Sequence, residues 1–200
     1  MLASHQTYSN ENFDGMDLTR QELKGSRFTR CSFVGARLQE LNTESCQFIE
    51  CNFTSAQLNA STHFRSAFMN SLFRHTNLFM ARFEECKMTG SVFEEAQVTG
   101  WTPLGGDWSY IHMRHHVLPK TDFSGAKLKE ADFYGCNLEM AKFVGADLTR
   151  VIFQQARLKG ADLREAVVEG IDFTGVNLRG VRMDMLQAVF VARSYGALID

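Results

Sequence analysis

Three of the six histidines lie close together in one stretch of the chain, at His112, His115 and His116. Histidine is a common metal ligand and a common general base near neutral pH. A metal site would also need acidic or cysteine ligands at a recognised spacing, and none accompanies these histidines. We therefore interpret them as solvated surface residues and expect no metal and no other cofactor.

Other sequence patterns that would indicate catalysis are absent. The chain contains no glycine-rich phosphate-binding loop, no nucleophile elbow, no HExxH motif and no pair of carboxylates at a spacing that indicates acid–base chemistry. Isolated serine, histidine and aspartate residues are then typical of a solvated surface. We expect a protein that is not an enzyme and has no catalytic residues, so its function would depend on shape and charge.

The elements that carry these residues follow a five-residue repeat from Phe13 to Met183. Of the 35 positions reached in steps of five, which we call centres, 32 are apolar, and the position two residues earlier is mostly small. Neither the helical period of 3.6 nor the strand period of 2 produces this pattern. One large and one small inward residue in each repeat predict a solenoid, whose coils bury their faces against the coils above and below.

The cysteines obey the same repeat, because all five occupy the small inward position. Their number is odd and no CxxC motif is present, which argues against a disulfide framework or a metal site. Equivalent Cβ atoms on adjacent coils would stand about 4.8 Å apart, farther than a disulfide prefers. We expect reduced cysteines that pack as small apolar side chains: Cys31, Cys46, Cys51, Cys86 and Cys136.

The exceptions to the repeat indicate how many repeats make one coil. The three centres that are not apolar, Thr43, His63 and Pro103, are separated by 20 and 40 residues. A coil of 20 residues, or four repeats, places all three in one column, whereas a coil of 15 would separate them. The whole repeat then makes nearly nine coils over about 42 Å. We expect this column to be dented near its N-terminal half, with Leu41 or Phe64 turning inward.

Residues 101–120 are the least regular part of the chain and contain both tryptophans and both prolines. Either a loop protrudes from the solenoid here, or one coil is irregular. The centres Trp108, Met113 and Leu118 stay in phase with the repeat, which favours the irregular coil.

The period changes after the last repeat, where a short helix is predicted. Asp184 is a suitable N-cap, Gly196 can end the helix, and Leu186, Val189 and Phe190 form an apolar stripe. Such a helix would cover the open end of the solenoid, whose backbone groups are otherwise unpaired. Because the stripe is wider than an end cap needs, we expect these three residues to form a twofold dimer interface.

The repeat resembles that of the pentapeptide-repeat family. Residues 126–150, AKLKEADFYGCNLEMAKFVGADLTR, are similar to the A(D/N)LxX signature of that family. The resemblance implies an all-β fold, a right-handed quadrilateral β-helix with four pentapeptides per coil. We expect a single solenoid domain over residues 1–200, comprising a lead-in at 1–12, repeats at 13–183 with the irregular coil at 101–120, and a C-terminal capping α-helix and tail at 184–200.

Within this family, the similarity is to fluoroquinolone-resistance proteins of the MfpA and Qnr type. It is carried by residues 66–93, SAFMNSLFRHTNLFMARFEECKMTGSVF, and by the ending GVNLRGVRMDMLQAVFVARSYGALI. The resemblance implies an end-to-end homodimer, joined through the C-terminal helix, that imitates duplex DNA and binds DNA gyrase or topoisomerase IV. It implies no catalytic residue, no direct binding of nucleic acid and no membrane.

The charges are distributed unevenly over the four sides of the predicted coil. The first face, with repeats centred on Phe13, Phe33 and every twentieth residue onward, has a net charge of −4. The second face, with repeats centred on Leu18, Leu38 and onward, has a net charge of +3. The carboxylates of the first face are the predicted partner-binding site: Glu11, Asp14, Glu94, Glu95, Asp132 and Asp172.

Mimicry of DNA would have to be local. A DNA duplex 42 Å long carries about 25 negative charges, whereas this chain has a net charge of −2. We expect a cytoplasmic protein, since no apolar run is long enough to cross a membrane and no signal-peptide pattern is present.

Three alternatives remain open, one of which is a self-resistance protein that acts beside a natural gyrase poison. The uneven charge could serve solubility alone, or the protein could be a non-enzymatic interaction scaffold for an unrelated partner that recognises Trp101, Trp108 and Tyr110.

Overall fold

The computed structural model describes residues 2–199, so that Met1 and Asp200, the ends of the predicted domain, lie outside the described residues. The chain forms two compact parts, one ending at Asp107 and the other beginning at Trp108. We call them the N-terminal part and the C-terminal part. A single continuous domain stays a prediction.

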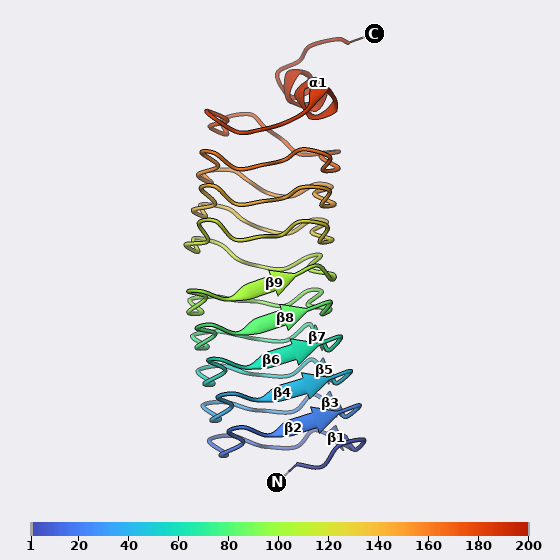
Figure 1. The fold of residues 1–200 in the computed structure, drawn as a ribbon, viewed down its shortest axis with the longest axis vertical. Helices are drawn as coiled ribbons and strands as arrows, with labels where there is room; N and C mark the ends of the chain where they lie inside the picture. The colour runs from blue at the N-terminus through green and yellow to red at the C-terminus, as the bar shows by residue number, and fades with distance from the viewer. Residues whose placement is uncertain (1, 200) are drawn as a thin grey trace. The chain divides into compact units, whose positions relative to one another are not determined.

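The N-terminal part consists of short parallel strands stacked in two sheets (Figure 1). Each strand pairs with the strand one coil later at an offset of 20 residues, as in Tyr8 with Phe28 and Leu23 with Thr43. This offset confirms four pentapeptides per coil. One sheet contains β1 (Thr7–Ser9), β3 (Arg27–Thr29), β5 (Gln47–Ile49) and β7 (Ala67–Met69). The other contains β2 (Glu22–Lys24), β4 (Asn42–Glu44), β6 (Thr62–Phe64), β8 (Arg82–Glu84) and β9 (Thr102–Leu104).

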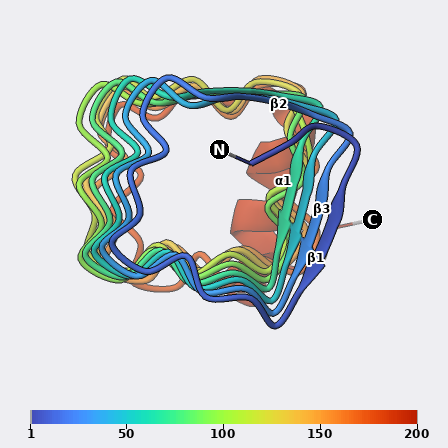
Figure 2. The ribbon, with the colours of Figure 1, turned by 90° about the horizontal axis from the view of Figure 1, so that it is seen from below.

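The remaining two sides of each coil are joined by single bridges with the same offset, such as Asn12 with Ser32 and Asp17 with Arg37. Seen along its axis, the blue to green chain of the N-terminal part turns through four sides (Figure 2). In the C-terminal part, bridges with this offset include Asp132 with Ile152 and Asn137 with Arg157. The predicted fold class, a parallel β-helix with a short C-terminal α-helix, is therefore confirmed.

Corners recur at the last residue of each repeat, where the backbone is left-handed; φ is 58° at Arg20 and 56° at Glu40. Glycine is frequent at these corners because it adopts positive φ without steric cost. The glycine requirement is strictest at Gly106, the residue after a corner, where φ is 79°. A Cβ there would lie 2.2 Å from the carbonyl oxygen of Cys86.

The core is a set of aromatic ladders, because the 20-residue offset places each centre over the next. In the N-terminal part, the ring centroids of Phe28, Phe48 and Phe68 are spaced by 4.7 Å, and successive rings are within 8° of parallel. In the C-terminal part, Phe123 and Phe143 stack at 5.5 Å. Stacked rings of this kind combine large apolar burial with favourable offset geometry.

The column that contains Thr43 and His63 is not dented, which corrects our expectation. Both side chains point into the core and are at most 3 % exposed. They are tolerated because they bond to each other: Thr43 Oγ1 lies 2.7 Å from His63 Nδ1, and Ser61 Oγ lies 2.9 Å from His63 Nε2. Leu41 is buried in its regular small position, and Phe64 stays outside, beneath the guanidinium of Arg65 at 4.6 Å.

The stretch 101–120 is divided between the two parts and protrudes from neither. Residues up to 107 belong to the N-terminal part, where β9 pairs with β8 in the regular register. In the C-terminal part, the centres Trp108, Met113 and Leu118 are at most 1 % exposed. Both pieces of the stretch therefore keep the phase of the repeat, and the irregular coil over 101–120 stays a prediction.

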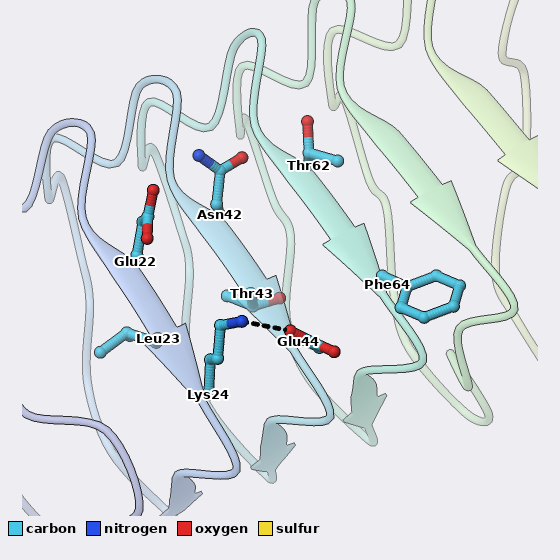
Figure 3. Close-up of a pocket in the computed structure, with 8 residues that line it drawn as sticks. All are labelled: Glu22, Leu23, Lys24, Asn42, Thr43, Glu44, Thr62 and Phe64. Atoms are coloured by element: carbon cyan, nitrogen blue, oxygen red, sulfur yellow. Dashed lines mark ion pairs between the residues drawn. The ribbon is translucent and has the colours of Figure 1, made fainter.

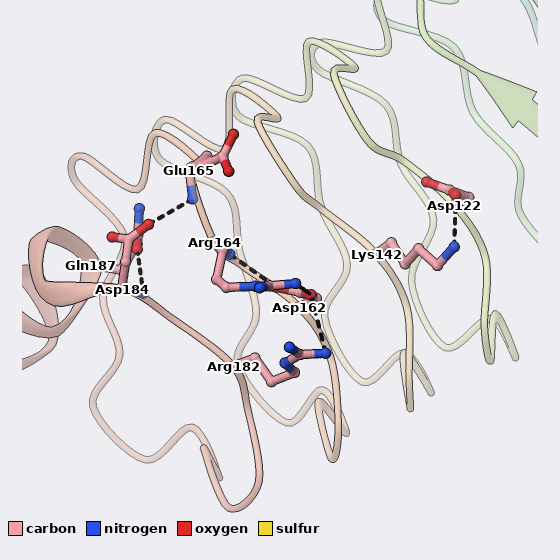
Figure 4. A network of polar contacts seen from close by, with 8 residues as sticks. All are labelled: Asp122, Lys142, Asp162, Arg164, Glu165, Arg182, Asp184 and Gln187. Atoms are coloured by element: carbon pink, nitrogen blue, oxygen red, sulfur yellow. Dashed lines mark hydrogen bonds and ion pairs between the residues drawn. The ribbon is translucent and has the colours of Figure 1, made fainter.

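Helix α1 (Met185–Ser194) begins after the predicted N-cap Asp184. The N–H of Asp184 donates to Gln187 Oε1 (2.9 Å), and Gln187 Nε2 donates to the carbonyl of Ala166 (2.9 Å). Asp184 Oδ2 also accepts a hydrogen bond from the N–H of Glu165 at 2.8 Å (Figure 4). These contacts satisfy polar groups at the end of the C-terminal part, as expected of a capping helix.

The helix ends where the sequence predicted. Gly196 follows it with φ of 85°, and its N–H donates to the carbonyl of Arg193 (2.9 Å). Near this end, Ser194 Oγ donates to the carbonyl of Ile171 and Tyr195 donates to that of Phe173. Within residues 2–199, no helix has the length and apolar character needed to cross a membrane.

Candidate protein-binding faces

Aspartate and asparagine residues directly before a centre stabilise the corners of the solenoid. Their side chains accept a hydrogen bond from the N–H two residues later, as Asp17 does from Thr19 (3.1 Å) and Asp147 from Thr149 (3.0 Å). Such Asx turns give the backbone N–H of a corner a partner. A carboxylate at this position therefore belongs to the scaffold as well as to the surface.

Two of the six predicted site residues, Asp132 and Asp172, are scaffold carboxylates of this kind. Asp132 accepts from the N–H of Tyr134 (3.0 Å) and pairs with Arg114 Nε (2.5 Å), and it is only 4 % exposed. Asp172 accepts from the N–H of Thr174 (2.8 Å), and hydrogen bonding to Thr174 lowers the pKa of Asp172. Asp172 is therefore an exposed carboxylate that is ionised at neutral pH, whereas Asp132 offers little surface to a partner.

The other four predicted site residues lie in the N-terminal part, as two separate pairs. Glu11 and Asp14 belong to the first coil of the first face, and Glu94 and Glu95 follow four coils later, about 19 Å along the axis. The three coils between them carry no carboxylate on this face. The structure therefore brings together the members of each pair but does not form one continuous acidic stripe.

Side chains of the preceding coil contact the second pair, and one of them is the cation Arg74. Glu94 lies 2.9 Å from Arg74 Nε, and Glu95 lies 3.2 Å from His75 Nδ1. The side chains of Glu94 and Glu95 are nevertheless 58 % and 73 % exposed. Exposed pairs contribute at most about 1 kcal/mol to stability, so either carboxylate can exchange its partner for a cation on another protein.

The positive charge of the second face is confined to the C-terminal part. In the N-terminal part its charges pair with each other, Arg20 with Glu40 at 2.9 Å and Arg37 with Asp17 at 2.6 Å. In the C-terminal part, Glu139 pairs with Arg157 (2.6 Å). Its other cations have no carboxylate within 4 Å among residues 108–199: Lys120, Lys159 and Arg179.

A shallow hollow lies on the outer surface of β2, β4 and β6 (Figure 3). Lys24 Nζ pairs with Glu44 there at 2.8 Å, and the hydrogen bond to Glu44 raises the pKa of Lys24. Glu22 and Phe64 also line the hollow. Its carboxylates are exposed and one is already paired, so the arrangement resembles an ordinary charged surface rather than a catalytic site.

The cysteines pack as the sequence predicted. All five are free and buried, at most 1 % exposed. The thiol of Cys86 donates to the carbonyl of His63 (3.3 Å), and that of Cys51 donates to the carbonyl of Phe28 (3.5 Å). Burial raises the pKa of Cys51, Cys86 and Cys136 to about 12, so these thiols are protonated at neutral pH and unreactive.

Two of the three clustered histidines are solvated as predicted, but His116 is buried, which corrects the prediction for that residue. His112 and His115 are exposed, with the ring of His115 packed edge-on against Tyr134, whereas His116 is only 8 % exposed. Among residues 2–199, no group of three histidine, cysteine or acidic residues could hold a metal ion.

Three aromatic residues were predicted to contact an unrelated partner if the protein is an interaction scaffold, and two of them are buried. Trp101 is 6 % exposed and Trp108 is fully buried, whereas Tyr110 is 42 % exposed. The signal was present in the sequence, because Trp108 is a centre and Trp101 is two residues before one. The tryptophans belong to the core.

The predicted dimer residues are exposed to different degrees. Leu186 is 63 % exposed, whereas Val189 and Phe190 are half-buried. The side chain of α1 that turns inward is Gln187, which is 1 % exposed. The apolar surface near the helix also includes Met185, which is 84 % exposed.

One feature of the surface was not predicted from the sequence. It consists of Phe79 and Met80 on the second face. They are 44 % and 58 % exposed. Elsewhere in the repeats, the two outward residues after a centre are never both large and apolar. That contrast is visible in the sequence once the inward and outward positions are assigned.

The 20-residue coil, the five-residue corners and the inward ladders agree with a match to the family model described as pentapeptide repeats, at residues 31–62, 112–143 and 141–180, together about half of the chain. The chain belongs to the pentapeptide-repeat family. This pentapeptide-repeat protein is 40 % identical over 73 residues to the pentapeptide repeat protein MfpA of Mycobacterium tuberculosis. That alignment covers 36 % of this chain and 40 % of MfpA.

Solved structures show the same fold over the whole length. A trypsin-treated form of QnrB1, a plasmid-mediated fluoroquinolone resistance protein, matches with a TM-score of 0.86 over 99 % of both chains at 22 % identity. A second trypsin-treated form matches with a TM-score of 0.85 at the same identity. At this level of identity, the likeness establishes the β-helical fold.

Proposed function

We propose that this pentapeptide-repeat protein binds a type II topoisomerase, DNA gyrase or topoisomerase IV, as a local mimic of duplex DNA. It would thereby protect the enzyme from gyrase poisons such as fluoroquinolones, or modulate its response to them. The identity to MfpA carries this proposal, and the likeness in fold to a fluoroquinolone resistance protein supports it. The protein acts by binding alone, without catalysis, in the cytoplasm.

Glu94 and Glu95 are the carboxylates best placed to substitute for phosphates. They are adjacent, exposed and held on the backbone of a corner, where φ at Glu95 is 53°. The ion pair of Glu94 with Arg74 and the contact of Glu95 with His75 are open to solvent, so an arginine or lysine of the partner can replace either at little cost in free energy. Charges at such positions mainly affect the rate of association and its dependence on salt.

The chain offers a matched control. Glu84 and Glu85 form the same dipeptide at the same repeat positions on the third face. Each is also paired, Glu84 with Arg82 of its own strand (2.8 Å) and Glu85 with Arg65 of the preceding coil (2.7 Å). We expect E94Q/E95Q to reduce the association rate with gyrase about tenfold at low salt. The E84Q/E85Q protein should remain within about twofold of the unmodified protein, with an unchanged unfolding midpoint in both variants.

Association and dissociation rates are measured with gyrase immobilised on a surface, at several salt concentrations. Supercoiling by gyrase is measured in parallel, in the presence and absence of a quinolone. Competition with linear DNA should accompany binding. Equal losses in the two variants would instead support a scaffold recognised by shape. Failure of the unmodified protein to bind either topoisomerase would remove the proposal.

We also propose that the protein is a homodimer joined through α1. The support is the apolar surface around the helix, where Met185 and Leu186 are 84 % and 63 % exposed and Leu198 is 98 % exposed. Exposed large apolar side chains in and after one short helix are typical of a surface that another protein covers.

A further inference from the structure

Phe79 and Met80 form an apolar projection on the second face of the N-terminal part. Both follow the centre Leu78 and face solvent, with 44 % and 58 % of their surface exposed. Outward positions of the other repeats usually hold polar or small residues, which keep the solenoid soluble. An exposed aromatic beside an exposed methionine is a composition enriched at protein interfaces and their energetic hot spots.

The backbone holds both residues in place. The N–H of Phe79 donates to Asn77 Oδ1 (3.0 Å), and the carbonyl of Phe79 accepts from the N–H of Ala60 (2.9 Å). The N–H of Met80 donates to the carbonyl of Thr99 (3.1 Å), and φ at Met80 is 59°. Because the backbone of this part of the surface is already ordered, binding a partner here would cost little backbone entropy.

Small residues flank the projection along the axis. Ala60 and Gly100 occupy the equivalent corner positions on the neighbouring coils. A Cβ at position 100 would lie only 3.3 Å from Met80 Sδ, so the methionine side chain extends over Gly100. The absence of larger neighbours leaves both apolar side chains accessible.

The second face itself is uncharged around the projection. On the second face, three consecutive coils of the N-terminal part have no acidic or basic residue. Their outward side chains are Gln57, Asn59, Ala60, Asn77, Phe79, Met80, Gln97 and Thr99. Nucleic acid and anionic membranes are recognised by clustered cations, so this surface fits neither. A neutral polar rim around an apolar centre fits a folded protein.

We propose that Phe79 and Met80 insert into an uncharged apolar pocket on the topoisomerase partner and form a second, charge-independent contact. This inference rests on the proposed function. The contact lies on a different face from Glu94 and Glu95, so one surface would guide association through charge while the other slows dissociation through apolar burial.

A second copy of this chain is the rival occupant, and three hollows of its surface do not suit the projection. Three hollows in the described surface all contain charged residues, among them Glu22 and Lys24 in one, Asp17 and Arg20 in another, and Arg157 in the third. Placing an apolar projection against such a hollow would bury charge without compensation.

The test uses replacements that the fold already accepts. Threonine follows the centre at position 99 and asparagine occupies a corner at position 70, so F79T/M80N should fold normally. The control is M140N, which removes a methionine that is 57 % exposed at the same corner position in the C-terminal part. Dissociation constants for gyrase are measured at low and high salt.

We expect F79T/M80N to weaken binding about tenfold or more at both salt concentrations, mainly through faster dissociation. M140N should stay within about twofold of the unmodified protein. The E94Q/E95Q protein should lose affinity only at low salt, because salt screens charge and not apolar burial. Unchanged circular dichroism and unfolding midpoints show that the variants are folded.

Other outcomes would overturn the inference. If F79T/M80N binds gyrase as tightly as the unmodified protein, the contact does not exist, although the proposed function stands. If F79T/M80N dissociates a dimer seen by sedimentation, the occupant is a second copy, and binding of the unmodified protein to neutral vesicles would indicate a membrane. If the unmodified protein does not bind a topoisomerase, the proposed function and the named occupant both fail.

Discussion

His63 should make the N-terminal part sensitive to mild acid. Its imidazole is fully buried, stacked on Phe83 at 4.8 Å and edge-on to Phe68 at 4.9 Å. Burial lowers the pKa of His63 from 6.5 to about 3. Each ring nitrogen has one hydroxyl partner: Thr43 Oγ1 lies 2.7 Å from Nδ1, and Ser61 Oγ lies 2.9 Å from Nε2.

The direction and size of the effect follow from proton linkage. Between about pH 6.5 and 3, the unfolded chain binds a proton at His63 that the folded chain does not, so the free energy of unfolding falls as pH falls. The slope is about 1.4 kcal/mol per pH unit. The slope is only half as steep at pH 6.5, where the unfolded histidine is half protonated, so from pH 6.5 to 4.5 His63 alone should reduce the free energy of unfolding by about 2 kcal/mol.

The control is His63→Phe, which continues the aromatic column of Phe83 and cannot titrate. Chemical denaturation at pH 7, 6, 5 and 4.5 measures the free energy of unfolding of both proteins. Between pH 6.5 and 4.5, the free energy of unfolding of the unmodified protein should fall relative to that of the variant by the amount given for His63. In the NMR spectrum, the imidazole resonance of His63 should remain constant down to pH 4.5. Parallel pH dependence in the two proteins would refute the reasoning.

Three further predictions concern the core, the thiols and the assembly. Phe133→Ala removes a fully buried centre and should lower the free energy of unfolding by about 3–5 kcal/mol. Tyr134→Ala, outside the core, should lower it by at least about 2 kcal/mol less. Equal losses would mean that the inward positions of the repeat are wrongly assigned. All five cysteines should resist a thiol reagent at pH 8 in the folded protein and react on unfolding, because they are buried, and rapid labelling of the folded protein would contradict this. Leu186→Asp should convert the dimer to a folded monomer in sedimentation experiments, with less disturbance than a change at the half-buried Phe190; a monomeric unmodified protein at micromolar concentration would exclude the dimer.

Much of the candidate site could be located from the sequence, but its chemistry could not. The repeat places Glu94 and Glu95 at outward positions, and the 20-residue coil places Arg74 one coil before Glu94, where the structure finds the ion pair. The burial of Asp132 was not predicted, because its Asx turn and its pairing with Arg114 depend on local backbone geometry and on a side chain from the neighbouring coil. The repeat correctly placed Asp132 at an outward position, but a residue at an outward position can still be covered by its neighbours.

The sequence by itself determined the period, the four-repeat coil, the inward cysteines and the start of the helix at Asp184. These features depend on short-range patterns that every coil repeats, so a single chain contains many independent copies of the same signal.

Only the tertiary structure decided what fills the irregular column and which charges remain free. His63 stays inside because Thr43 on one neighbouring coil and Ser61 on its own coil satisfy its ring nitrogens, and Phe83 on the next coil stacks against it. Such contacts join residues 20 apart through particular side-chain orientations, and the repeat pattern does not contain that information. A buried polar group is stable only where its partners lie within hydrogen-bonding distance.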